Sequence, residues 1–134
     1  MEKLNKAHSD LYKAYGRQDF SYCDAYLKRG LHKDSAAYLS MLVDELGFDR
    51  KDYDIHSNEG GIAGSGEITL HTNTLYVQIS QFALSGSYLS FLIRGCESRK
   101  DYSGHRNHTL RILPRNLDVV LETCRKAKRR EVGV

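Results

Sequence analysis

EITLHTNTLYVQIS, residues 67–80, is the stretch that decides the fold. Apolar and polar side chains alternate through both of its halves, and Asn73 stands where the alternation is interrupted. A period of two puts one row of side chains on each face of a strand. The stretch therefore predicts two strands joined by a tight turn at Asn73, with one face of the pair buried.

Three further segments have the character of strands on either side of this hairpin. They are residues 53–57, 89–93 and 110–112. The connections along the chain are too short for the crossover that parallel neighbours need, so neighbouring strands must run antiparallel. We expect an antiparallel sheet of four or five strands, with residues 53–57 at its edge.

The chain before the sheet has the spacing of helices. Apolar side chains recur every three or four positions over residues 2–16, and Gly16 is placed to end this helix in a left-handed cap. A shorter helix is expected to begin at Ser21 and to stop before Gly30. Its inward side chains would be Cys23, Tyr26 and Leu27.

A further helix is expected from Asp34 or Ser35 to Gly47. Five tyrosines fall in this first third of the chain, and we interpret them mainly as half-buried core side chains rather than as stacking platforms. They are Tyr12, Tyr15, Tyr22, Tyr26 and Tyr38.

A closing helix is predicted at residues 114–130, because Pro114 suits a first helical turn and one apolar stripe follows it. The expected fold class is α+β, with N-terminal helices, the antiparallel sheet, and a C-terminal helix packed on the sheet. We expect a single domain over 1–134, made of a helical part (1–47), the sheet (53–113) and the closing helix (114–130).

Composition is that of a globular protein, with 40% hydrophobic and 28% charged residues among 134. The three cysteines lie far apart without a CxxC pair, which favours reduced thiols over a disulfide framework or a zinc site. The N-terminus lacks an apolar signal region, and no apolar run approaches the ~18 residues of a membrane span. The sequence thus predicts a cytoplasmic protein without a membrane segment, a metal or a cofactor.

Charge is distributed unevenly along the chain. Residues 1–93 hold nine Lys or Arg against twelve Asp or Glu, whereas residues 94–134 hold eleven against five. Clustered cations attract anions over a long range, so the C-terminal third is expected to meet an anionic partner. The alternative is a solvated helix face followed by a solubilising tail.

The segment GCESRKDYSGHRNH, residues 95–108, is the predicted binding element. Its cations suit phosphate contacts and its tyrosine can stack on a base, while arginines beyond it extend the same basic surface. In the alternative interpretation, Glu97 and Asp101 neutralise the neighbouring cations within a rigid loop. The predicted polyanion-binding residues are Arg99, Lys100, Tyr102, Arg106, Arg111, Arg115 and Arg125.

Three other motifs are assigned no chemistry. GGIAGSG, residues 60–66, is followed by a strand rather than by a helix, so it is predicted to be a loop and not a phosphate cradle. His105 and His108 lack a recognisable third ligand, for which His71 and Asp101 are the candidates. Cys96 stands at a strand end, where small buried cysteines are common, so a Cys–His nucleophile is not favoured.

The segment 105–130 is similar to the tail of HNH-type endonucleases, through HRNH and the following PRNLDVVLETCRKAKRR. The resemblance implies a general base at His105 or His108 on a hairpin, and the family's helical asparagine at Asn116. The chain departs from the family pattern, because it has no Asp-His pair, a Lys or Arg replaces the ligand histidine, and Cys124 has no second cysteine. A metal-dependent nuclease is therefore only the third prediction.

The first prediction is a small non-enzymatic binding protein whose basic C-terminal third engages nucleic acid or another polyanion. The second is an inhibitor or adaptor that docks on a partner protein and acts by occlusion. It would use the acidic surface of residues 44–54, or tyrosines exposed on the N-terminal helices. Neither prediction fixes the ligand or the oligomeric state.

Overall fold

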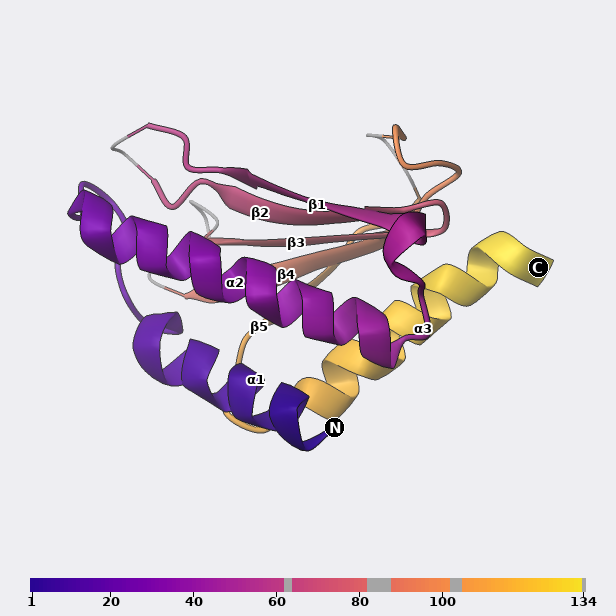
Figure 1. The fold of residues 1–134 in the computed structure, drawn as a ribbon, viewed down its shortest axis with the longest axis horizontal. Helices are drawn as coiled ribbons and strands as arrows, with labels where there is room; N and C mark the ends of the chain where they lie inside the picture. Colours follow the sequence, from indigo (N-terminus) through magenta and orange to yellow (C-terminus); the bar gives the residue numbers. More distant parts are fainter. Residues whose placement is uncertain (62–63, 82–87, 102–104, 134) are drawn as a thin grey trace.

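The computed structural model describes residues 1–61, 64–81, 88–101 and 105–133, with side chains as far as residue 128. Helices and sheet form two layers, and all three α-helices lie on one face of the sheet (Figure 1). The elements in chain order are α1 (Glu2–Tyr15), α2 (Ala25–Glu45), the 3-10 turn η1 (Arg50–Asp52), β1 (Tyr53–Asn58), β2 (Glu67–Thr72), β3 (Leu75–Gln81), β4 (Leu89–Gly95), β5 (His108–Arg111) and α3 (Leu117–Gly133). The predicted α+β class is confirmed.

The five strands form an antiparallel meander in the order β1-β2-β3-β4-β5. The hairpin predicted from residues 67–80 is present, with Ile68 opposite Ile79 and Leu70 opposite Val77. Phe91 of β4 extends the first of these rows. Because each strand alternates faces, these apolar side chains form the side of the sheet that the helices cover.

The core lies between this face and the helices. α2 contacts β1 and β2, α3 contacts β4 and β3, and α1 packs on α2. Tyr38 of α2 and Phe91 of β4 are fully buried, and their ring centroids are 5.8 Å apart. Inside this core, His8 of α1 is buried and its Nδ1 lies 2.8 Å from the Tyr38 hydroxyl. The three helices therefore share one core with the sheet.

The predicted break in the helical region at Gly30 is wrong. α2 runs through Gly30 without interruption and begins after Asp24, whose carboxylate accepts a hydrogen bond from the Leu27 amide at 2.8 Å. A Cβ at position 30 would come within 2.8 Å of the Tyr15 hydroxyl, so the glycine serves close packing of α1 against α2 rather than a helix end. Asp24, not Ser21, caps the helix.

Two further details of the helices differ from expectation. Gly16 has a right-handed conformation (φ −56°), so α1 does not end in a left-handed cap. The closing helix begins at Leu117 instead of residue 114, because Pro114 and Arg115 form a turn before it. Of the tyrosines expected in the core, Tyr22 and Tyr26 are exposed.

The outer face of the sheet carries polar side chains that pair with one another. The Tyr76 hydroxyl donates to Gln78 at 2.7 Å, and the ring of His71 lies edge-on to those of His56 and Tyr76. Burial, assisted by the neighbouring His56, lowers the pKa of His71 below its ordinary value. Arg94 is 5% exposed and lies over the Tyr76 ring, 4.2 Å from its centroid. In the described part of the chain, no helix is both long and apolar enough to cross a bilayer.

Candidate binding groove

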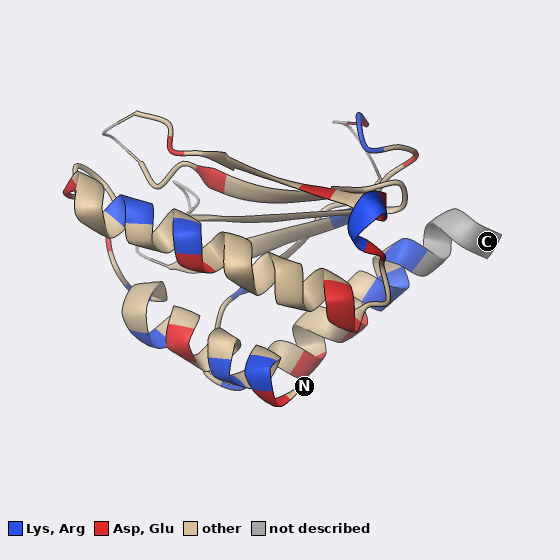
Figure 2. Cartoon of the chain, viewed as in Figure 1, with Lys and Arg blue, Asp and Glu red and all other residues tan. Residues whose placement is uncertain are grey.

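The structure does not gather the predicted polyanion-binding residues on one patch. Arg111 lies on the outer face of β5, where its guanidinium stacks on Tyr88 at 3.6 Å. Arg125 is exposed on α3, which packs on the opposite face of the sheet. Lys and Arg positions are distributed over α1, α2, η1, α3 and the β4–β5 connection (Figure 2). Arg111 and Arg125 therefore lie on opposite faces of the sheet.

Arg99 is engaged within the protein. Its guanidinium pairs with the Asp54 carboxylate at 3.1 Å and donates to the Lys51 carbonyl. Asp54 is on β1 and Arg111 on β5, four strand spacings apart, which corresponds to roughly 19 Å. Lys100, Arg106 and Arg115 are exposed. Tyr102 lies outside the described residues.

The second interpretation of residues 95–108, a loop that satisfies its own charges, agrees better with the contacts. The Asp101 carboxylate accepts a hydrogen bond from the Glu97 amide at 2.9 Å. The Glu97 carboxylate in turn pairs with the His105 ring at 3.1 Å. The acidic side chains of this segment are thus used inside it, and Arg99 is anchored to β1 and its preceding turn.

Asn116, which the nuclease resemblance implies as a site residue, has another role here. The Asn116 side chain accepts from the Leu113 amide at 3.0 Å and donates to the Arg111 carbonyl at 2.8 Å, and its oxygen also lies 2.9 Å from His8 Nε2. It therefore braces the turn into α3 against α1. No group of three or more His, Cys, Asp or Glu side chains is placed to hold a metal ion, as far as the structure describes the chain.

Cys96 follows β4 and is buried, and its thiol donates to the Thr72 carbonyl at 3.2 Å. Such a contact fixes the end of the sheet. The expected buried cysteine at a strand end is confirmed by this position.

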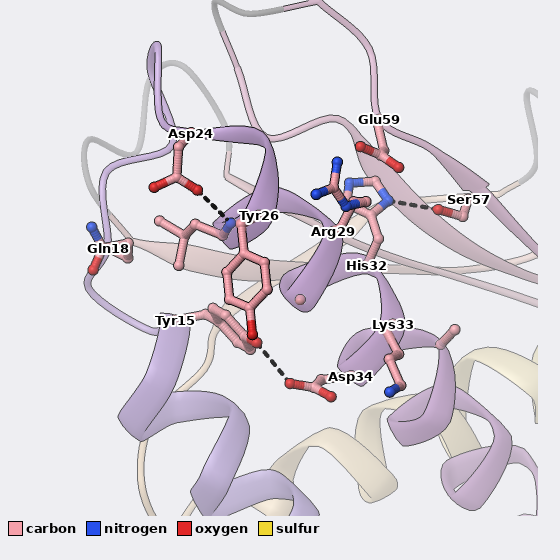
Figure 3. Close-up of a pocket in the computed structure, with 13 residues that line it drawn as sticks. Tyr15, Gln18, Asp24, Tyr26, Arg29, His32, Lys33, Asp34, Ser57 and Glu59 are labelled. Atoms are coloured by element: carbon pink, nitrogen blue, oxygen red, sulfur yellow. Dashed lines mark hydrogen bonds between the residues drawn. The ribbon is translucent and has the colours of Figure 1, made fainter.

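A different site stands out, a groove of about 990 Å³ between the first half of α2 and β1. Figure 3 shows its walls, which come from the end of α1, the α1–α2 connection, α2 and β1. The groove exists because β1 is an edge strand and the α2 side chains beneath it become polar toward the helix N-terminus. Its lining residues are Tyr15, Gln18, Asp24, Tyr26, Leu27, Arg29, Gly30, His32, Lys33, Asp34, Ala36, Ser57 and Glu59.

Two buried side chains of α2 hold the β1–β2 hairpin against the helix. Lys28 is 6% exposed, and its ammonium donates to the Gly61 carbonyl at 2.6 Å and to the Glu59 carbonyl at 3.2 Å. His32, one turn further along α2, bonds to Ser57 and Ser65. The hairpin that forms one wall of the groove is thereby fixed to the helix that forms the other.

The opposite end of the groove is closed by a tyrosine. The Tyr15 hydroxyl donates to the Asp34 carboxylate at 2.7 Å, joining α1 to α2. Burial, followed by this bond, raises the pKa of Tyr15 above its ordinary value, so the phenol stays protonated across the physiological range. This wall is therefore held by a bond that does not change with pH near neutrality.

The exposed side chain of Tyr26 lies at the mouth of the groove, and Tyr22 is a second exposed tyrosine in the connection before α2. Tyr26 is 83% exposed and Tyr22 is 72% exposed. Tyr22 also has φ of 57°, a left-handed conformation that is rare for a bulky side chain. Tyr26, Arg29 and Lys33 are spaced at i, i+3 and i+7, so they form one stripe along the exposed side of α2.

No protein-family model, curated protein or solved structure gives a significant match to this chain. The fold defines an α+β protein with helices on one face of an antiparallel meander.

Proposed function

We propose that this chain is a protein-binding module that captures an extended, acidic segment of a partner in the groove between α2 and β1. The observation that carries the proposal is the large exposed ring of Tyr26 at the mouth of a groove that borders an edge strand. Tyrosine and arginine are among the residue types most enriched in the side chains that dominate binding energy at interfaces. The proposal develops the second of the sequence-based predictions, docking through exposed tyrosines.

An extended segment suits the groove because of the strand beside it. β1 has a strand neighbour on one side only, and its residues 56–58 are exposed. The unpaired edge of a sheet can accept a further strand, whose backbone supplies hydrogen bonds while alternate side chains enter the neighbouring pocket. Here the pocket for those side chains is the groove.

Charge favours an acidic segment. Arg29 and Lys33 line the groove from α2 and are exposed, and within the described chain neither forms a salt bridge. Their spacing of four residues puts both cations on the same side of the helix. A partner carboxylate bound between these two cations would lose water, and its charge-assisted hydrogen bonds to them would be stronger for that reason. Glu59 on the opposite wall would repel an acidic side chain of the partner at that wall, and this repulsion would set the direction in which the partner segment lies in the groove.

The experiment is selection of short random peptides displayed on phage against the full chain, followed by affinity measurement on the winners. Acidic peptides of extended conformation are expected. The Tyr26→Ala variant should weaken binding about tenfold or more, because loss of an interface anchor costs on the order of 1.4 kcal/mol or above. Arg29→Glu should weaken it further by repelling the acidic segment.

Arg125→Ala provides the matched control, because it removes an exposed cation from α3, away from the groove. It should leave peptide affinity unchanged. Peptides that bind Tyr26→Ala and Arg29→Glu as well as they bind the original chain would refute the proposal.

Binding to nucleic acid stays a prediction, and the same variants separate it from peptide capture. A single-stranded oligonucleotide serves as the probe. Affinity that falls steeply with salt and is lost in Arg125→Ala or Arg111→Ala, but not in Tyr26→Ala, would favour the polyanion prediction over the groove.

A further inference from the structure

A serine and a histidine lie in hydrogen-bond contact on the wall of the groove. Ser57 Oγ is 2.6 Å from His32 Nδ1 (Figure 3), and His32 Nε2 is 2.8 Å from the Ser65 carbonyl oxygen. A carbonyl oxygen can only accept, so Nε2 carries the ring proton. In the neutral ring Nδ1 is then the acceptor, and the Ser57 hydroxyl donates to it. The tautomer is fixed by the backbone of the β1–β2 hairpin.

The position of Ser57 in the sheet is unusual. Its register partner is Ile68, and the same cross-strand row continues through the buried Ile79 and Phe91, so packing alone would favour an apolar side chain at position 57. Ser57 is nevertheless exposed, because the groove opens in front of it. His32 behind it is only 4% exposed. The hydroxyl is accessible to a ligand while its partner base is shielded.

We propose that Ser57 is a nucleophile that His32 activates as a general base, and that the groove accepts the acyl group of a carboxylic ester. Three features agree with this role: a hydroxyl within hydrogen-bond reach of an unprotonated ring nitrogen, a base oriented by a third group, and an open site in front of the hydroxyl. The orienting group here is the Ser65 carbonyl, which takes the place that a carboxylate has in many such sites. The inference concerns chemistry and does not depend on peptide capture.

The reaction needs no cofactor, because every bond and proton is accounted for by the ester, Ser57, His32 and water. A bond forms between Ser57 Oγ and the ester carbonyl carbon while the hydroxyl proton passes to His32 Nδ1. The ester C–O bond then breaks, and the leaving alkoxide takes that proton from Nδ1. Water repeats the sequence on the acyl-serine, releasing the carboxylic acid and restoring the Ser57 hydroxyl.

The groove supplies surroundings for each part of such a substrate. Arg29 and Lys33 are cations that line the same groove, and a cation stabilises the oxyanion that develops on the carbonyl oxygen. Leu27 and Ala36 provide apolar surface for the acyl chain. A short acyl ester is thus the substrate class that the lining fits.

The test uses p-nitrophenyl acetate and a fluorophosphonate as probes, with the full chain and tandem mass spectrometry to locate the adduct. We expect the acyl or phosphonyl group on Ser57, and none in Ser57→Ala. His32→Gln should slow the modification of Ser57 by about 100-fold or more, which is the usual contribution of a general base. His32→Asn should be equally slow, because its side chain can accept the serine hydrogen bond but cannot take the proton.

Ser21→Ala is the matched control, since Ser21 is exposed but its side chain has no imidazole partner in the described structure. Modification in this variant should equal that of the original chain. Circular dichroism identifies any His32 variant that fails to fold. If the His32 variants do not fold, the positions of the adducts in the original chain still test the proposal: adducts spread over several serines, or none on Ser57, would overturn it. If His32→Gln folds, modification of Ser57 at the same rate as in the original chain would also overturn it.

Discussion

Replacing Gly66 by alanine is expected to destabilise the hairpin that frames the groove, for two separable reasons. Gly66 has φ of +69°, which an L-residue adopts at a cost of roughly 1–2 kcal/mol. A Cβ at this position would also overlap the Asn58 carbonyl oxygen and lie 2.6 Å from the Glu59 carbonyl carbon. These are backbone atoms of the facing strand end, so they cannot rotate away.

Relieving that overlap requires the two arms of the hairpin to separate, which is comparable to overpacking and adds roughly 1–3 kcal/mol. The total loss in unfolding free energy is therefore about 2–5 kcal/mol. With a urea dependence of about 2 kcal/mol per molar, the unfolding midpoint should fall by about 1–2.5 M. Far-ultraviolet circular dichroism during urea titration measures it.

Two other glycines act as controls. Gly47 has φ of +89°, but a Cβ added there would meet no atom within 4 Å, so Gly47→Ala isolates the backbone cost of roughly 1–2 kcal/mol. Gly64 has neither feature, and Gly64→Ala should change stability by no more than about 0.5 kcal/mol. A Gly66→Ala protein that unfolds no earlier than Gly47→Ala would show that the close approach to Asn58 is wrong.

Three further predictions concern other parts of the molecule. Burial lowers the pKa of His71, so as pH falls below about 6.5 the unfolded chain takes up a proton before the folded chain does. The unfolding free energy should therefore decline below this pH, and it should decline less in His71→Gln. An equal decline in the two proteins would contradict the prediction. Burial raises the pKa of Cys124 to about 12, so iodoacetamide should alkylate the half-buried Cys23 in the folded protein but Cys124 only after unfolding. Peptide mass mapping measures both reactions, and rapid labelling of Cys124 in the native state would refute its burial. Asn116→Ala removes one hydrogen-bond partner of the buried His8 and should lower the free energy of unfolding by about 1–3 kcal/mol, and with it the melting temperature. An unchanged melting temperature would show that the contact between Asn116 and His8 contributes nothing to stability.

The sheet could be predicted because its signal is local. The alternation over residues 67–80 fixes both the strand type and the buried face, and the short turn fixes the antiparallel pairing. The continuity of α2 could not be read in the same way. Gly30 resembles a helix end in sequence, and only its tertiary contact with Tyr15 explains it as a packing residue.

The groove could not be predicted from local sequence patterns, because it depends on tertiary contacts. His32 and Ser57 are separated by 25 positions along the chain, and their contact depends on how α2 crosses β1. The signal that was available is weaker: Ser57 interrupts the apolar positions of its strand, and His32 occupies an inward position of its helix. The separation of Arg111 from Arg125 could not be predicted either, because charge counts along the sequence do not tell which face of the sheet each arginine occupies.

Hydrogen–deuterium exchange of β1 tests the central claim, capture of an extended segment at its free edge, most directly. The backbone amides of residues 53–58 are compared in the free protein and with a saturating peptide obtained by selection. The account predicts slower exchange in this strand and in the facing turns of α2, residues 26–34, when the peptide is bound. Unchanged exchange in β1, with protection appearing on β5 or α3 instead, would contradict it.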